Sequence, residues 1–236
     1  MSVEKWLRLA VVLIGIGAGL AAFGCSDSPG LAVPGEGDLD ISICDPAGGT
    51  FTIESTNEFF PMVVEEVSNF LGEEEGAAVE TVRTVLDETE VVAGVTTRVI
   101  EERETVDGEL VEVSRNFFAQ AADGTICYFG EDVDTYEGGV VIGHEGAWRA
   151  GEGNNLPGIQ IPAVPEVGMT YAQEYAPGVA EEHSEIVAMG EHLSVPAGEF
   201  DDTLRVIETS ALDGDESLKI YVSGIGLAVD DTRELQ

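Results

Sequence analysis

Residues 109–121 read ELVEVSRNFFAQA, and this stretch decides the predicted fold. Apolar and polar side chains alternate along it with a period of two. One face carries Val111, Val113, Phe117 and Ala119, and the other carries Glu112, Ser114, Asn116 and Gln120. A two-residue period is typical of a half-buried β-strand, because successive side chains of a strand point to opposite faces of the sheet. We therefore predict a strand over 109–121.

Turn signals bracket this strand and recur along the chain. Asp107-Gly108 precedes it and Asp123-Gly124 follows it, and Gly138-Gly139 and Asp213-Gly214 repeat the pattern. Such dipeptides supply the positive φ angles of tight hairpins. The sequence thus predicts consecutive antiparallel strands at residues 79–87, 95–106, 109–121, 125–137 and 140–149.

The second half of the chain continues the same pattern after a loop. Residues 151–168 are rich in glycine and proline and are predicted to be irregular. Further strands are expected at 169–175, 179–194, 203–212, 216–223 and 226–230, while 60–71 fits either a short helix or a strand. The predicted fold class is all-β with minor α: a curved antiparallel meander sheet, a half-barrel or a sandwich.

The N-terminal 24 residues have the organisation of a secretory signal. Lys5 and Arg8 give a mildly positive start, and residues 9–23 carry no charge. That apolar run has the length of a signal-peptide core and is too short and too rich in glycine and alanine for a transmembrane helix. It ends in Gly24-Cys25, which fits a lipobox, and we predict cleavage before Cys25 and lipid attachment to its thiol. A plain anchor helix with an incidental cysteine is the alternative.

The predicted domain plan follows from this cysteine. Residues 1–24 are the lipoprotein signal peptide, 25–38 a flexible tether rich in Gly, Pro, Ser and acid, and 39–236 a single antiparallel β domain. Two acyl chains make membrane attachment stable. We expect an extracytoplasmic protein, anchored to the cell membrane or to an outer membrane; Ser26 favours the outer membrane in a cell that has two.

The charge balance limits the partners. The chain holds 46 acidic and 10 basic residues, a formal net charge of −36 at pH 7. Such a surface repels nucleic acid and anionic lipid headgroups. It resembles the surfaces of halophile proteins, where salt screens the self-repulsion, and it is compatible with cationic partners.

Two cysteines remain once Cys25 is assigned to lipid. Exported compartments permit disulfides, so Cys44 and Cys127 could form a bridge that pins the N-terminal segment to the middle of the sheet. Two buried free thiols are the equal alternative, because spacing alone cannot decide.

No motif indicates a catalytic centre or a cofactor. The three histidines lack zinc-ligand spacing, no acidic cluster completes an EF-hand loop, and no nucleophile elbow occurs. The candidate metal ligands are Glu145, Glu174, Glu181 and His183, with a solvated polar strand face as the alternative reading.

Aromatic residues gather around the predicted glycine-proline loop: Tyr128, Phe129, Trp148, Tyr171 and Tyr175. In a curved sheet, such residues can line a concave apolar pocket. They are our candidate ligand-binding residues, and their alternative role is the core of the domain.

Several motifs together resemble one family of uncharacterised exported bacterial proteins. They are YFGED at 128–132, EGAWRAG at 145–151, QEYAPGVAE at 173–181 and VPAGEF at 195–200, within a similarity spanning most of 57–228. The resemblance implies export and a β-rich fold but no reaction. Cys127 stands where that family usually has tryptophan.

The function predicted from these features is a non-catalytic envelope lipoprotein. Its β domain is expected to bind a small apolar ligand or an envelope protein through a concave face. Divalent-cation binding is the second hypothesis and an exported enzyme the third.

Overall fold

The structure is a computed structural model and describes residues 38–236. The predicted signal peptide (1–24), Cys25 and residues 26–37 of the predicted tether lie outside the described residues. Asp38 already belongs to the folded domain, since the Leu39 amide donates to the Thr170 carbonyl at 2.8 Å and the Asp38 carboxylate lies 3.1 Å from His183 Nε2.

The regular secondary structure of the described residues is almost entirely β-strand. The first run is β2 (Val67–Glu74), β3 (Ala77–Val92), β4 (Val95–Val106), β5 (Glu109–Ala121), β6 (Ile126–Glu137) and β7 (Val140–Gly143). The second is β10 (Thr170–Ala176), β11 (Ala180–Met189), β14 (Thr203–Ser210), β15 (Glu216–Val222), β16 (Gly226–Asp230) and β17 (Arg233–Leu235). Each run is an antiparallel meander, as the sequence predicts.

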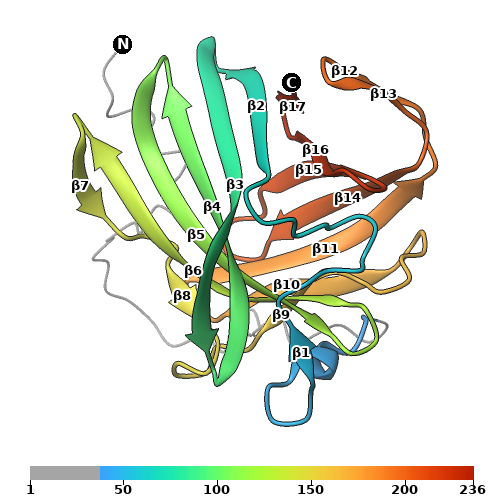
Figure 1. Ribbon diagram of the computed structural model, residues 1–236. Helices are drawn as coiled ribbons and strands as arrows, with labels where there is room; N and C mark the ends of the chain where they lie inside the picture. The colour runs from blue at the N-terminus through green and yellow to red at the C-terminus, as the bar shows by residue number, and fades with distance from the viewer. Residues whose placement is uncertain (1–37) are drawn as a thin grey trace, which may run out of the picture.

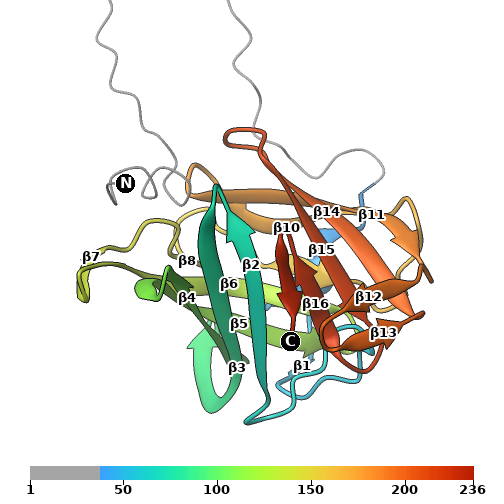
Figure 2. The same cartoon turned by 90° about the horizontal axis from the view of Figure 1, so that it is seen from above.

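The two meanders join into one antiparallel sheet through the C-terminal strand. β17 pairs with β2, with Leu235 opposite Phe70, so the sheet runs β10-β11-β14-β15-β16-β17-β2-β3-β4-β5-β6-β7. It curves strongly, so that its two halves face each other (Figures 1 and 2), and it is not closed on itself. The all-β curved-sheet prediction is confirmed.

Tight turns set the register of the meander. At the β4–β5 hairpin, Asp107 and Gly108 both have positive φ, 50° and 82°. This is the backbone of a two-residue hairpin whose twist matches that of its strands. The Asp107 side chain also accepts a hydrogen bond from the Ala78 amide at 3.1 Å, which ties the turn to β3.

The structure decides one alternative that the sequence left open and corrects one expectation. Residues 60–71 form no helix; the second part of that segment starts β2, whose residues alternate between exposed and more buried positions. The loop at 151–168 is not wholly irregular, because it contains β9 (Gly158–Ile161), all four residues of which are buried. Its apolar Ile159 and Ile161 pair with β6 and outweigh the flanking prolines.

Strand β9 lies between β6 and β10. It pairs with β6, and the preceding Leu156 forms a bridge with Tyr175 of β10. Gly158 permits this approach: a Cβ there would lie 1.7 Å from the Gln173 carbonyl oxygen. Strand β9 can therefore approach β10 this closely only with glycine at this position.

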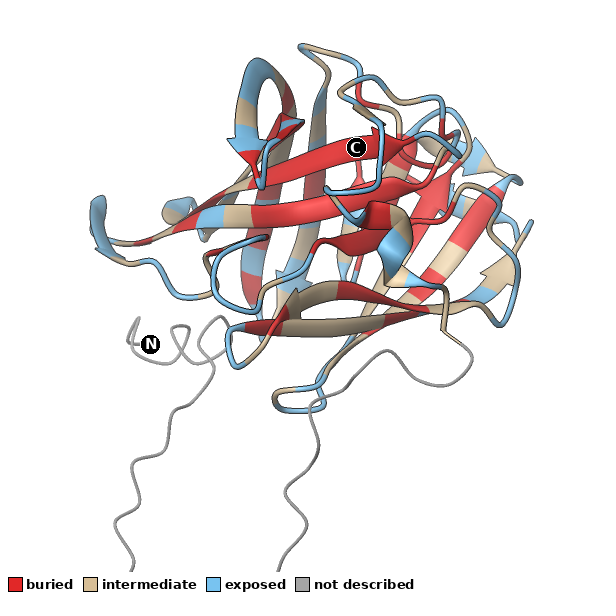
Figure 3. Cartoon of the chain, turned by 90° about the horizontal axis from the view of Figure 1, so that it is seen from below, coloured by how far each residue is buried: buried red, intermediate tan, exposed pale blue. Residues whose placement is uncertain are grey.

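The N-terminal segment is bonded to β5 and β6, near the β7 end of the sheet and not at its middle. The 3-10 helix η2 (Ile41–Cys44) places Cys44 in a disulfide with Cys127 of β6, so the bridged alternative of the sequence analysis is the one present. β1 (Phe51–Thr52) pairs with β5, and Phe51 packs edge-to-face on Phe129 with ring centroids 5.4 Å apart. The buried stretches of β5 and β6 are red in Figure 3.

A second, smaller sheet covers one face of the C-terminal meander. It consists of β12 (Leu193–Val195) and β13 (Gly198–Phe200). Val195 packs on Ile220 and Val229, which alternate with the inward-facing Lys219 and Asp230. The hairpin therefore lies on the side of β15 and β16 that faces away from the interior of the curve.

Candidate functional site

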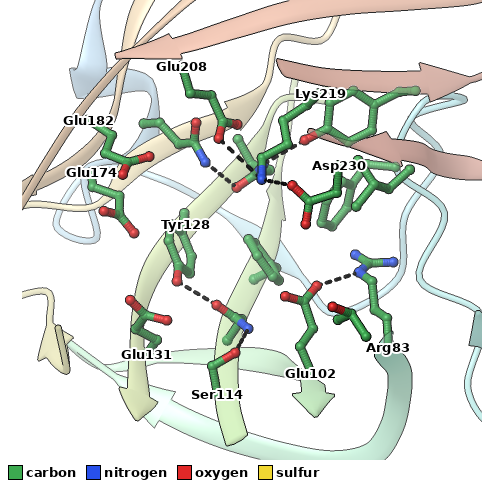
Figure 4. Close-up of a pocket in the computed structure, with 18 of the residues that line it drawn as sticks. Arg83, Glu102, Ser114, Tyr128, Glu131, Glu174, Glu182, Glu208, Lys219 and Asp230 are labelled. Atoms are coloured by element: carbon green, nitrogen blue, oxygen red, sulfur yellow. Dashed lines mark hydrogen bonds and ion pairs between the residues drawn. The ribbon is translucent and has the colours of Figure 1, made fainter. Parts of the chain in front are cut away.

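The concave side of the sheet encloses a cavity of about 350 Å³. Its lining includes eight carboxyl side chains, from Glu102, Glu104, Glu112, Glu131, Glu174, Glu182, Glu208 and Asp230. Only three basic side chains share it, from Arg83, Lys219 and Arg233. Figure 4 shows Glu131, Glu174 and Glu182 on one side and Lys219 and Asp230 on the other.

The polar face of β5 lines this cavity. Glu112, Ser114 and Asn116 of β5 all contribute to its wall. The opposite, apolar face is buried as well: Phe117 is 2% exposed, and the Arg149 guanidinium lies 4.6 Å from its ring centroid. The alternation read from the sequence is therefore correct, but the polar side lines an interior cavity.

Bulges turn several of the lining residues inward. In β6 the register shifts between Tyr128, opposite Phe118, and Glu131, opposite Asn116. Without the extra residue, two side chains three positions apart would point to opposite faces. Gly130, at φ 121°, occupies this bulge. Tyr128 and Glu131 consequently line the same cavity.

Bulges also turn side chains into the cavity on its opposite wall. The β10–β11 register shifts between Ala172 and Glu174, so the adjacent Gln173 and Glu174 both line the cavity. A shift between β15 and β16 similarly brings Leu227 and Asp230 to one face. Bulges are frequent next to functional sites because they re-aim side chains.

Ion pairs occupy the basic side chains of the cavity. Arg83 Nε lies 3.1 Å from Glu102. Lys219 pairs with Asp230 and lies 3.9 Å from Glu208. Arg233 pairs with Glu104, and its Nη2 lies 3.0 Å from Asp230. The two neighbouring cations hold the pKa of Asp230 below its usual range despite burial.

Four carboxyls of the lining form no ion pair with any described residue: Glu112, Glu131, Glu174 and Glu182. Burial and then the neighbouring carboxylates raise the pKa of Glu112 to about 7 and that of Glu131 to about 8. The same causes place the pKa of Glu174 well above its usual range. Near neutral pH, several of these groups therefore keep a proton.

Hydrogen bonds hold the neutral groups of the wall in place. The Tyr128 hydroxyl donates to Asn116 Oδ1 at 2.6 Å, and Asn116 Nδ2 donates to Ser114 Oγ at 3.1 Å. On the other wall, Gln160 Nε2 donates to the Tyr221 hydroxyl at 3.1 Å, and Ser184 Oγ donates to Gln173 at 2.7 Å. These hydrogen bonds fix the polar groups of both walls within the protein itself.

Trp148 of β8 (Trp148–Arg149) carries a hydrogen-bond donor, its indole N–H, and packs against the lining residue Tyr128. Its side chain is 4% exposed, its ring meets Tyr128 edge-to-face at 5.4 Å, and its indole N–H has no hydrogen-bond partner. This N–H favours the charged form of the Glu174 carboxyl and opposes the pKa increase caused by burial and by the neighbouring carboxylates, without cancelling it. A buried donor without an acceptor costs free energy and requires an explanation.

The predicted aromatic ligand-binding set is only partly placed at the cavity. Tyr128 lines it. Phe129 and Tyr171 are completely buried in the main core cluster, which also contains Trp148, and Tyr175 is partly buried in β10. The predicted apolar pocket is wrong, because the residues that line the concave side are mostly polar.

The predicted metal ligands are not brought together. Glu174 faces the cavity, whereas Glu145 is exposed in the loop after β7. Glu181 accepts from the Gly178 amide at 2.6 Å in the β10–β11 turn, and His183 pairs with Asp38. Neighbouring residues of β11 point to opposite faces, which separates His183 from the cavity. Within residues 38–236, no group of three or more metal-ligating side chains is assembled.

The sequence analysis did not predict most of the residues that line the cavity. The carboxyls Glu112, Glu131, Glu182 and Glu208 look in the sequence like any other acidic strand residues of a very acidic chain. The sequence does hold one sign that Glu131 turns inward: Gly130, which lies between Phe129 and Glu131. A glycine within a strand pattern indicates a bulge.

No family model, curated protein or solved structure matches the chain. No helix in the described part of the chain is long and apolar enough to cross a membrane.

Proposed function

We propose that this chain is a lipid-anchored, extracytoplasmic binding protein that holds a small polar solute in the cavity of its curved sheet. The observation that carries the proposal is the preorganised polar lining: Tyr128, Asn116 and Ser114 are joined by hydrogen bonds on one wall, and Gln160 and Tyr221 on the other. Ligand sites typically combine a concave enclosure with a few fixed polar groups.

Binding fits this geometry better than packing alone does. A stable core is filled by apolar side chains at near-crystalline density. In this domain a cavity instead lies beside partly buried carboxyls. This arrangement lowers the free energy of unfolding. Such a cost is typical of a functional site.

The ligand test uses the full chain purified in mild detergent. Calorimetry against a panel of neutral polyols, small carboxylate anions and small amines should give saturable heat with at least one class. Ser114→Leu, which fills the cavity from β5, should abolish that heat. Thr96→Leu, on an exposed position of β4, should leave it unchanged. No heat with any class, or equal heat with Ser114→Leu, would reject a binding cavity.

The anchor is proposed from sequence, since Cys25 lies outside the described residues. An uncharged run ending in Gly24-Cys25, followed by a glycine- and proline-rich segment, supports lipid attachment. Cell fractionation tests it. The native chain should sediment with membranes, and Cys25→Ser should remove the acylated N-terminal fragment from the mass spectrum. An unacylated Cys25 in the native protein would refute the anchor.

A further inference from the structure

We infer that the solute is a small organic cation, an alkylammonium or short diamine, held by Glu131, Glu174 and Glu182. This inference rests on the proposed binding function and specifies its ligand. These three carboxyls come from three strands, β6, β10 and β11, and lie on one side of the cavity (Figure 4). Glu174 and Glu182 are direct cross-strand partners.

Charge is the first argument. The three basic side chains of the lining are already engaged by Glu102, Glu104, Glu208 and Asp230. None of these cations forms an ion pair with Glu131, Glu174 or Glu182, although the Lys219 ammonium favours the charged form of Glu182. Two ionised carboxyls directly across a strand pair repel each other, so Glu174 and Glu182 can ionise together at low cost only beside an added positive charge.

The indole of Trp148 is an independent argument. Its buried N–H forms no regular hydrogen bond with any described residue, yet it lies near enough to Glu174 to favour the charged form of that carboxyl. When Glu174 keeps its proton, this donor gains little. When a bound cation holds Glu174 in its charged form, the N–H can donate to a carboxylate, which is the stronger acceptor. Trp148 therefore supplies a donor that the ionised form of Glu174 uses better than the protonated form does.

The lining favours an organic cation over a metal ion. Calcium needs six to eight oxygen ligands converging at about 2.4 Å, and no metal-ligating group is assembled in residues 38–236. Aromatic carbon also contributes to the lining: Phe118 and Tyr128, whose rings stack on each other with centroids 4.7 Å apart, both border the cavity. Such apolar carbon can contact the carbon stem of an amine.

Proton release should accompany binding. An empty cavity keeps protons on Glu131 and Glu174, and an ammonium group competes with these protons for the same carboxyls. Affinity should therefore rise with pH, by about tenfold per unit for each proton displaced, until Glu131 ionises near its pKa of about 8.

The test is calorimetry of the full chain with putrescine at pH 6 and pH 8. Repeating each titration in two buffers of different ionisation enthalpy counts the protons released. We expect tighter binding at pH 8 and net proton release below it. Glu131→Gln and Glu174→Gln should each weaken binding about tenfold and reduce the protons released. Glu185→Gln, an exposed residue of β11, should change neither.

The outcomes separate the two proposals. Saturable binding of polyols or anions but not of amines would overturn the cationic ligand and leave the binding cavity intact. Amine binding that is independent of pH and equal in Glu174→Gln would place the cation elsewhere and also overturn the inference. The glutamine variants remove carboxyl repulsion, so they should fold, and circular dichroism checks this.

Discussion

Gly130 shows how one residue shapes the cavity. Its φ of 121° and the close carbonyl of Trp148 leave no room for a side chain: a Cβ would lie 2.2 Å from that oxygen. The bulge that it permits turns Glu131 toward Tyr128 instead of away from it. A single glycine thus decides whether a carboxyl enters the interior.

Gly130→Ala should lower the free energy of unfolding by about 3 kcal/mol, because it adds backbone strain and a steric clash. Gly178→Ala is the matched control, since Gly178 also has positive φ, 78°, but nothing lies within 4 Å of its Cβ position. That variant should lose only about 1 kcal/mol. Urea denaturation measures both, and equal losses would contradict the role of the close approach.

Lys219 is the second residue with a distinct predicted effect. Lys219→Met leaves the buried Glu208 without an ion-pair partner among the described residues and leaves Asp230 with Arg233 alone. Removing one partner of a buried pair costs about 3–5 kcal/mol. Arg205→Met removes a more exposed pair with Glu191, 3.5 Å apart, and should cost at most about 1 kcal/mol. Comparable unfolding midpoints for the two variants would refute the network.

At the scale of elements, hydrophobic periodicity and turn dipeptides predict the meander because both are local. The strand at 95–106 and that at 109–121 have the predicted bounds. Strand β9 depends on contacts between strands that are distant in the sequence. Glu131 and Glu174 point into the cavity because of bulges. No local pattern encodes either feature. For the same reason, periodicity identifies the polar face of β5 but does not show that it lines a cavity.

The Cys44–Cys127 bridge ties η2 to β6 across a sequence separation of 83 residues. Closing a loop of this size restricts the unfolded chain and stabilises the fold by about 4 kcal/mol. The double variant Cys44→Ala/Cys127→Ala should therefore melt well below the native protein. Reductant should lower the melting temperature of the native protein but not that of the double variant. An unchanged native melting temperature in reductant would show that the bridge contributes nothing.

At the scale of the whole molecule, the cavity should govern the pH dependence of stability. The pKa of Glu131 is about 8 in the folded protein against an ordinary 4.5, and that of Glu112 is about 7. The folded state thus binds these protons more tightly than the unfolded state, so stability falls as pH rises from about 4.5 to about 8. Asp230, whose pKa is lowered, acts oppositely and makes stability fall in strong acid.

Chemical denaturation between pH 3 and pH 9 should accordingly show a maximum at mildly acidic pH. Glu131→Gln should flatten the decline toward pH 8, because it removes the group that loses its proton there. A stability that is constant or that rises between pH 5 and pH 8 would be inconsistent with protonated cavity carboxyls.

Carbon-13 NMR of the glutamate side-chain carboxyls in the full chain tests the central claim most directly, with Glu131→Gln and Glu174→Gln assigning the two signals. At pH 6.5 and without ligand, both should lie at the position of a protonated carboxyl, and the Glu131 signal should titrate near pH 8. Putrescine added at pH 7 should move both to the ionised position. Signals already ionised at pH 6.5, or unmoved by putrescine, would contradict the account.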